Sequence, residues 1–135
     1  MRFMVMGMTT KESEAGPPPT PEAFAAMQQY NEELVKAGVL LAAEWLTPSA
    51  QGVRVKFSDD RITVIDGPFA EAKELVAGFT ILQVKSKEEA IEWVKRAPRI
   101  APHGEAVVEI RKLMDVEDFG DGFTPNEEIA SVKFR

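Results

Sequence analysis

The stretch Asp66-Gly67-Pro68-Phe69-Ala70-Glu71-Ala72-Lys73-Glu74 ends one apolar run and precedes the next. The Gly-Pro pair predicts a sharp turn, because glycine tolerates unusual φ values and proline holds φ at about −65°. Three carboxylates and a lysine lie in the same stretch. Charged residues this close to a turn can form a ligand site, or they can simply be exposed to solvent. The segments on either side of the turn predict the fold.

One helix is predicted on each side of this turn. Residues 21–37 carry apolar side chains at helical spacing, with Thr20 as the N-cap and Gly38 as the stop. The second helix, residues 86–97, begins at Ser86, and a glutamate three residues later completes a capping-box pattern.

Apolar and alternating runs predict six strands. Apolar and charged residues alternate strictly over residues 53–57, so one face of that strand is expected to be buried and the other exposed to solvent. An Asp-Asp turn joins this run to residues 62–65, which predicts a hairpin. The six runs are residues 3–8, 39–46, 53–57, 62–65, 78–85 and 105–113.

The order of these elements predicts a ferredoxin-like α+β fold. Two strand–helix–strand units with right-handed crossovers place both helices on one face of a single antiparallel sheet. The other face would stay bare, so we expect a homodimer built sheet to sheet. This domain spans residues 1–113, and residues 114–135 form a C-terminal tail that docks on the domain or on the dimer partner.

Composition narrows the function classes. The 135 residues are 44% hydrophobic, which suits one domain with a real core. Lys and Arg number 16 against 22 Asp and Glu, and the net charge of −6 argues against nucleic-acid binding. Without cysteine and with one histidine, the chain cannot build a Cys-ligated zinc site or a multi-His metal centre alone. No apolar run is long enough to span a membrane. We therefore expect a cytoplasmic protein without metal or organic cofactor.

Several segments together resemble a known family. The stretch 66–74 followed by Gly78-Phe79 resembles the signature of the YCII-related proteins called DGPF-domain proteins, over roughly residues 1–113. The resemblance implies a dimeric α+β barrel of bacterial origin, and some family members occur beside or fused to sigma factors of the extracytoplasmic type. Further matching segments are Glu33-Leu34-Val35-Lys36-Ala37-Gly38-Val39, Glu89-Ala90-Ile91-Glu92-Trp93 and Glu109-Ile110-Arg111.

Two departures from the family pattern bear on function. Ala72 stands where the signature usually has threonine. The YCII branch carries a helix histidine paired with an aspartate, and Met27 occupies the matching position here. That dyad cannot be transferred, and His103 lies in a loop before the last strand, where it is not the equivalent.

Two carboxylates are the candidate catalytic residues. Asp66 at a strand end could act as a general base, or it could accept backbone N–H bonds and fix the turn. Glu44 lies in an apolar strand, where a carboxylate is suited to proton transfer if it lines a cavity. The alternative is that Glu44 pairs with Arg54 or Arg111 on another strand.

Five further residues are candidate ligand contacts. Lys73 could hold a substrate carboxylate or belong to a solvated charged face. Asn31 lies within the apolar stripe of the first helix, where its amide could contact a ligand or a loop backbone. Tyr30, the sole tyrosine, could donate to a ligand or pack at the helix margin. Arg54 and Arg111 supply guanidinium groups near the expected pocket.

These residues favour two functional hypotheses. The first is a cofactor-independent acid–base enzyme acting on a small metabolite, since carboxylates are present and no strong nucleophile is evident. The second is a non-catalytic ligand-binding or regulatory module. The absence of the family's helix histidine favours this hypothesis, and the link of some family members to sigma factors is consistent with it. The ligand itself does not follow from the sequence.

Overall fold

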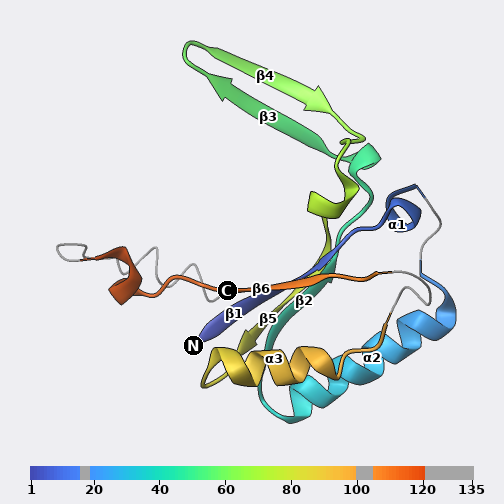
Figure 1. Ribbon diagram of the computed structural model, residues 1–135, viewed down its shortest axis with the longest axis vertical. Helices are drawn as coiled ribbons and strands as arrows, with labels where there is room; N and C mark the ends of the chain where they lie inside the picture. The colour runs from blue at the N-terminus through green and yellow to red at the C-terminus, as the bar shows by residue number, and fades with distance from the viewer. Residues whose placement is uncertain (16–18, 100–104, 121–135) are drawn as a thin grey trace.

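Four strands form an antiparallel sheet in the order β2-β5-β1-β6, and the helices α2 and α3 cover one of its faces (Figure 1). The computed structural model describes residues 1–15, 19–99 and 105–120, without the side chains of Glu12, Ala15 and Lys73. The ferredoxin-like α+β fold is thereby confirmed. The strands are β1 (Arg2–Met8), β2 (Leu40–Trp45), β3 (Val53–Ser58), β4 (Arg61–Asp66), β5 (Val76–Gln83) and β6 (Val108–Lys112). The helices are α1 (Lys11–Ala15), α2 (Pro21–Lys36) and α3 (Lys87–Lys95), with 3-10 turns η1 (Ser49–Gln51), η2 (Ala72–Glu74) and η3 (Val116–Phe119).

The predicted capping signals set the helix ends. The Thr20 hydroxyl accepts a hydrogen bond from the Ala23 N–H at 3.1 Å and caps α2. Gly38 follows the helix with a φ of 73°, in the left-handed region that glycine adopts without strain. The Ser86 hydroxyl caps α3 by accepting the Glu89 N–H at 3.1 Å. Both helices therefore begin where their N-cap residues predict.

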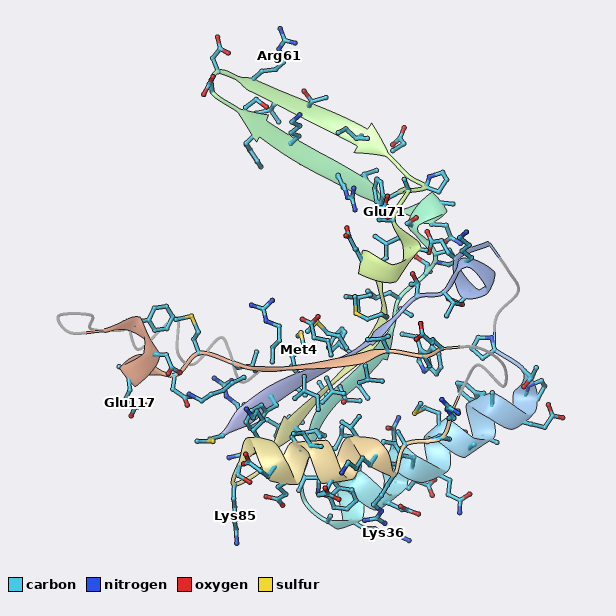
Figure 2. The ribbon with its side chains drawn as sticks, viewed as in Figure 1. Met4, Lys36, Arg61, Glu71, Lys85 and Glu117 are labelled. Carbon is cyan, nitrogen blue, oxygen red and sulfur yellow. The ribbon has the colours of Figure 1, made fainter. Side chains whose placement is uncertain are left out.

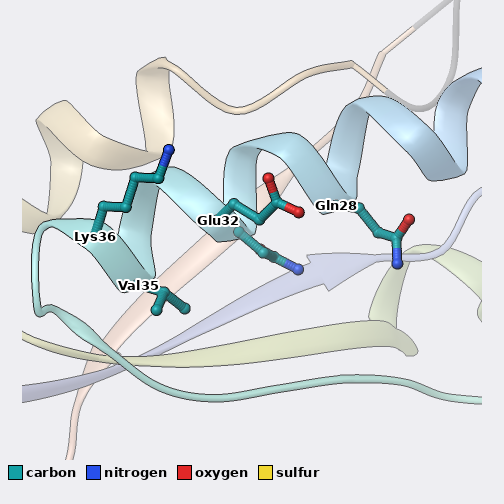
Figure 3. Close-up of a pocket in the computed structure, with 5 residues that line it drawn as sticks. Gln28, Glu32, Val35 and Lys36 are labelled. Carbon is teal, nitrogen blue, oxygen red and sulfur yellow. The ribbon is translucent and has the colours of Figure 1, made fainter.

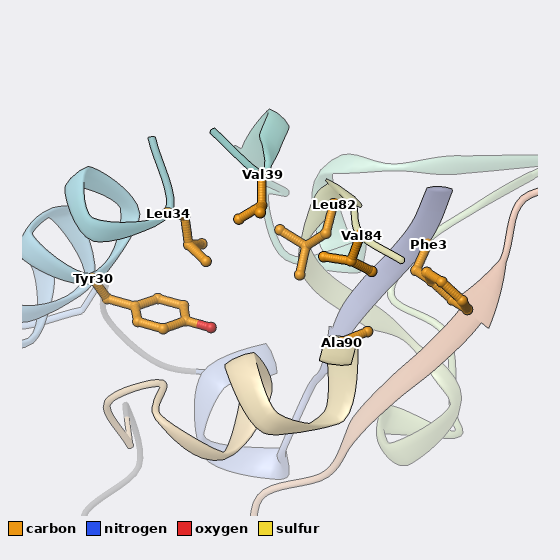
Figure 4. Close-up of a cluster of buried hydrophobic side chains, with 7 residues drawn as sticks. All are labelled: Phe3, Tyr30, Leu34, Val39, Leu82, Val84 and Ala90. Atoms are coloured by element: carbon orange, nitrogen blue, oxygen red, sulfur yellow. The ribbon is translucent and has the colours of Figure 1, made fainter. Parts of the chain in front are cut away.

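The core lies between the sheet and the two helices (Figure 4). Leu34 of α2 and Leu82 of β5 are 0% and 1% exposed. The Tyr30 hydroxyl donates to the Trp93 carbonyl oxygen at 2.6 Å, which ties α2 to the end of α3. The buried residues are Phe3, Tyr30, Leu34, Val39, Leu82, Val84 and Ala90.

Strands β3 and β4 form a separate two-stranded sheet, which we call the arm (residues 53–66). The arm stands away from the body on the side of the four-stranded sheet opposite α2 and α3 (Figure 1). The predicted hairpin is confirmed, but the expectation that one of its faces is buried is wrong, because every residue of β3 and β4 is exposed. The hairpin also lies outside the single sheet that the sequence predicted.

Two further segments lie outside the four-stranded sheet and the helices that cover it. Residues 11–15, for which the sequence analysis predicts no helix, form the short helix α1. Beyond β6, Lys112 Nζ lies 2.6 Å from an Asp118 carboxylate oxygen and 3.4 Å from one of Asp115, which fixes η3 to the end of β6. His103 and residues 121–135 of the predicted tail lie outside the described residues.

Candidate functional site

The face of the four-stranded sheet turned away from α2 and α3, here called the open face, is the first candidate site. Phe3, Leu82 and Ile110 pack on the helix side, so their strand neighbours point to the other face. Figure 2 shows Met4 on that face. The strand register aligns two rows across it: Glu44, Phe79, Met6 and Glu109 form one, and Ala42, Ile81, Met4 and Arg111 form the next.

The open face has an apolar centre and a charged rim. Its centre consists of half-buried side chains from β1 and β5. Glu44 lies on the outer strand β2, while Glu109 and Arg111 lie on the opposite outer strand β6, with Arg111 Nε 4.0 Å from a Glu109 carboxylate oxygen. Three strand spacings separate the two rims by about 14 Å. Within one chain, a small molecule can contact the centre and one rim but cannot bridge both rims.

Sequence reasoning missed the centre of the open face. Met4 and Met6 are not among the candidate residues that the sequence suggested. The available signal was that β1 is apolar at every position from Phe3 to Met6, not at alternate positions. A strand that is apolar on both sides is typical of a sheet covered on both faces.

The second feature is the connection between the arm and the body, which we call the joint (residues 49–52 and 66–69). Gly67 donates its N–H to the Gly52 carbonyl at 2.9 Å. A Cβ atom at Gly67 would overlap the carbonyl group of Ser49, so only glycine fits this close approach. The Phe69 N–H donates to the Ser49 hydroxyl at 3.0 Å. These contacts give the Gly-Pro-Phe part of the signature stretch a structural role.

Further side chains complete the joint. The Arg54 guanidinium carbon lies 3.9 Å from the centroid of the Phe69 ring, in cation–π contact. The Glu14 carboxylate accepts from the Ser49 N–H at 2.9 Å and also from the Ser49 hydroxyl. The bonds from Ser49 to Glu14 thus connect η1 to α1. The contact between Arg54 and Phe69 connects β3 to the turn that follows β4.

The predicted site residues fall in three places. Asp66 and Arg54 lie at the base of the arm, on adjacent strands but on opposite faces, since Asp66 pairs with Val53 and Arg54 with Ile65. Both are exposed. Glu44 and Arg111 lie on opposite rims of the open face. Residues 30 and 31 lie on α2, across the sheet from that face, and the Lys73 side chain is outside the description.

The two α2 residues differ in their surroundings. Burial raises the pKa of Tyr30 from 10.0 to about 12, and its hydroxyl is already bonded to the Trp93 carbonyl oxygen. The Asn31 Oδ1 atom is shielded from solvent and has no hydrogen-bond partner among the described residues. Asn31 lines an open depression of about 400 Å³ along α2 (Figure 3). The other lining residues are Gln28, Glu32, Val35 and Lys36.

The described residues contain neither a metal-binding cluster nor a membrane-spanning helix. No three acidic or histidine side chains there come together as a metal ion would require. None of the helices in that part of the chain has both the length and the apolar character needed to cross a bilayer.

Comparison with known proteins places the chain in a family. The model of the YCII-related domain matches residues 1–116. The chain belongs to the YCII-related family. An uncharacterized protein of Rhizobium meliloti (strain 1021) is 34% identical over 69 residues, which make up 51% of this chain and 56% of the relative. The match therefore spans little more than half of that relative's length, and the relative is itself uncharacterized.

Proposed function

We propose that this YCII-related protein forms a homodimer through its open faces and binds a small molecule between them. The observation that carries the proposal is the apolar centre of the open face, formed by Met4, Met6, Phe79 and Ile81. The two helices cover only the other face of the sheet. A second copy facing this centre would bury it and enclose a site, in line with the preference of soluble oligomers for two-fold symmetry.

The site's composition suggests its ligand class. Methionine and phenylalanine side chains make favourable contacts with aromatic and other apolar groups. A charged rim can then orient a polar substituent at the edge of such a ligand. We therefore propose a small metabolite with an apolar or aromatic body and one acidic group.

The proposed reaction is proton transfer without metal or organic cofactor. Glu44 is our first candidate for the base, since it lies in the same row as Phe79 and Met6. Its carboxylate would take a proton from the bound ligand, and Arg111 of the second copy would hold an anionic group. Asp66 is the second candidate base, because it lies where the arm joins the body.

A non-catalytic ligand-binding or regulatory module is the second candidate function. Neither Glu44 nor Asp66 forms a side-chain hydrogen bond or ion pair with another described residue, whereas a catalytic base is commonly oriented by a partner. The Asp66–Glu74 stretch supports assignment to the DGPF branch, whose link to sigma factors suits a regulatory role. Both functions fit a cytoplasmic protein that binds neither nucleic acid nor membrane.

Two measurements test the proposal. Sedimentation analysis should give a dimer for the wild type and a weaker dimer for Met6→Lys, which places a charge at the apolar centre. A wild-type chain that stays monomeric up to high micromolar concentration would overturn the shared site. Thermal shift against a metabolite library should then identify stabilising compounds, because a ligand specific for the folded state raises its melting temperature.

The choice between enzyme and binding module needs variants. Glu44→Gln and Asp66→Asn remove one charge each, and Glu88→Gln on α3 is the matched control away from the open face. Loss of turnover with retained binding in either of the first two identifies the base. A compound that binds all four proteins without being converted favours the regulatory module.

A further inference from the structure

The arm has one face made almost entirely of apolar side chains. In the register of β3 and β4, Phe57 pairs with Ile62 and Val55 pairs with Val64, so these residues share a face with Val53. The five side chains are between 49% and 75% exposed. We call them the arm's apolar face. Exposed apolar clusters that are contiguous in this way mark interaction surfaces.

The opposite face of the arm is suited to water. It carries Arg54, Lys56 and Arg61, together with Ser58 and Thr63, and its one apolar residue is Ile65, opposite Arg54. A two-stranded hairpin alone is marginally stable in water, and three or more strands or a packing partner are normally needed. The arm therefore requires a partner on its apolar face, and its polar face shows which side remains in solvent.

The position of the arm identifies what the partner is. The arm stands on the same side of the sheet as the open face (Figure 1), so a molecule seated on the open face lies beside the arm. Both uncovered apolar surfaces thus occur on one side of one chain. A second copy of this chain offers the same two surfaces in return, and a two-fold axis lets each arm contact the other copy.

The size of the interface supports the same partner. The two rows across the open face contain eight residues, whereas a stable interface uses about 20–30 residues a side. The arm's apolar face extends the contact with residues that are otherwise exposed. The arm carries three positive side chains on its polar face and three aspartates, so its net charge is zero. It therefore adds no charge repulsion when it approaches a second chain of net charge −6.

We propose that the arm clasps a second copy of this chain, with its apolar face packed against the copy seated on the open face. This inference rests on the proposed homodimer and adds to it a specific role for residues 53–66. The joint has the corresponding role of holding the arm at its angle to the body, through the Gly67 N–H bond to Gly52 and the contact of Arg54 with Phe69.

The test compares two faces of the same strand. Ile62→Thr combined with Val64→Thr makes the apolar face polar while it keeps the branched side chains that strands favour. Ile65→Thr makes the same kind of change on the opposite face and is the matched control. In sedimentation equilibrium of the full chain, we expect the double variant to raise the dimer Kd at least tenfold and the control less than twofold. Circular dichroism of each variant checks that the body is folded.

The outcomes separate this inference from the proposed function. If the wild type and the double variant dimerise equally, the arm inference is wrong and the sheet-to-sheet dimer stands. If the double variant weakens the dimer while Met6→Lys does not, the arm holds the two copies together and the sheet-to-sheet proposal is wrong. A monomeric wild type overturns both, and assigns the arm to a different protein.

Discussion

Replacing Gly67 by alanine tests the role that the structure gives to the joint. The added Cβ atom would overlap the Ser49 carbonyl oxygen and lie 2.6 Å from its carbonyl carbon and 3.3 Å from the Ala50 nitrogen. All three are backbone atoms, so rotation of a side chain cannot relieve the overlap. Excess volume in a packed region costs about 1–3 kcal/mol. Separating the two segments also breaks the Gly67 N–H bond to Gly52, worth about 1 kcal/mol.

We therefore expect Gly67→Ala to lower the free energy of unfolding by roughly 2–4 kcal/mol. For a domain of this size, that corresponds to a melting temperature about 10 °C below wild type. Gly52→Ala is the matched control in the same joint, because its Cβ would make an ordinary contact of 3.5 Å with the Ser49 carbonyl oxygen. Its stability should change by less than about 1 kcal/mol. Equal melting temperatures for the two variants, at the same protein concentration, would refute the reasoning.

Three further predictions concern the core and the ion pair after β6. Leu34→Ala should lower the free energy of unfolding by about 2–5 kcal/mol in urea titration, since this side chain is fully buried; a loss under 1 kcal/mol would contradict its place in the core. Tyr30→Phe should cost about 1–3 kcal/mol near pH 7, because the Trp93 carbonyl oxygen loses its donor. Because the pKa of Tyr30 is raised from 10.0 to about 12 in the folded state, the contribution of its hydroxyl to the free energy of unfolding is complete below pH 10 and is lost as the pH rises towards 12. The difference in unfolding free energy between wild type and Tyr30→Phe should therefore narrow over that range, and a difference that stays constant would argue against this role. The hydrogen bond from Lys112 lowers the pKa of Asp118 below 3.8, and carboxyl NMR titration should show Asp118 titrating at higher pH in Lys112→Met; an unchanged titration would exclude the pair in solution.

Local signals in the sequence were sufficient for α2, α3 and the six strands. Thr20 and Ser86 each supply a side-chain cap that acts within three residues, so the two helix starts could be predicted without knowing the rest of the fold. The short helix α1 could not, because residues 11–15 have no apolar period. Its start has a local cap, since the Thr10 hydroxyl accepts the Ser13 N–H at 3.1 Å, and the Glu14 carboxylate also binds it to Ser49.

The candidate site depended on contacts between distant residues. The alternation of apolar and charged residues over residues 53–57 indicates that one side of the strand is apolar, but it does not indicate what covers that side. The structure leaves that side uncovered in the single chain. Likewise, Glu44 and Glu109 lie in the same row of the open face because four strands from different parts of the chain pair in this register. That register does not follow from any local stretch of sequence. Asp66 was found from its neighbours in sequence, and its place at the arm's base follows from the same local turn.

The strand order β2-β5-β1-β6 has a consequence for how the chain is made. Among the described residues, β1 pairs with β5 and β6 and β2 pairs with β5 alone, so the two strands of this sheet that precede residue 76 do not bond to each other. During synthesis at about 5–20 residues per second, β1 waits roughly 4–15 s before its first partner strand exists. Until then, its apolar side chains are available to other nascent chains and to chaperones. No strand pair of this sheet can therefore form behind the ribosome until β5 has emerged, and the sheet is complete only after β6 has followed.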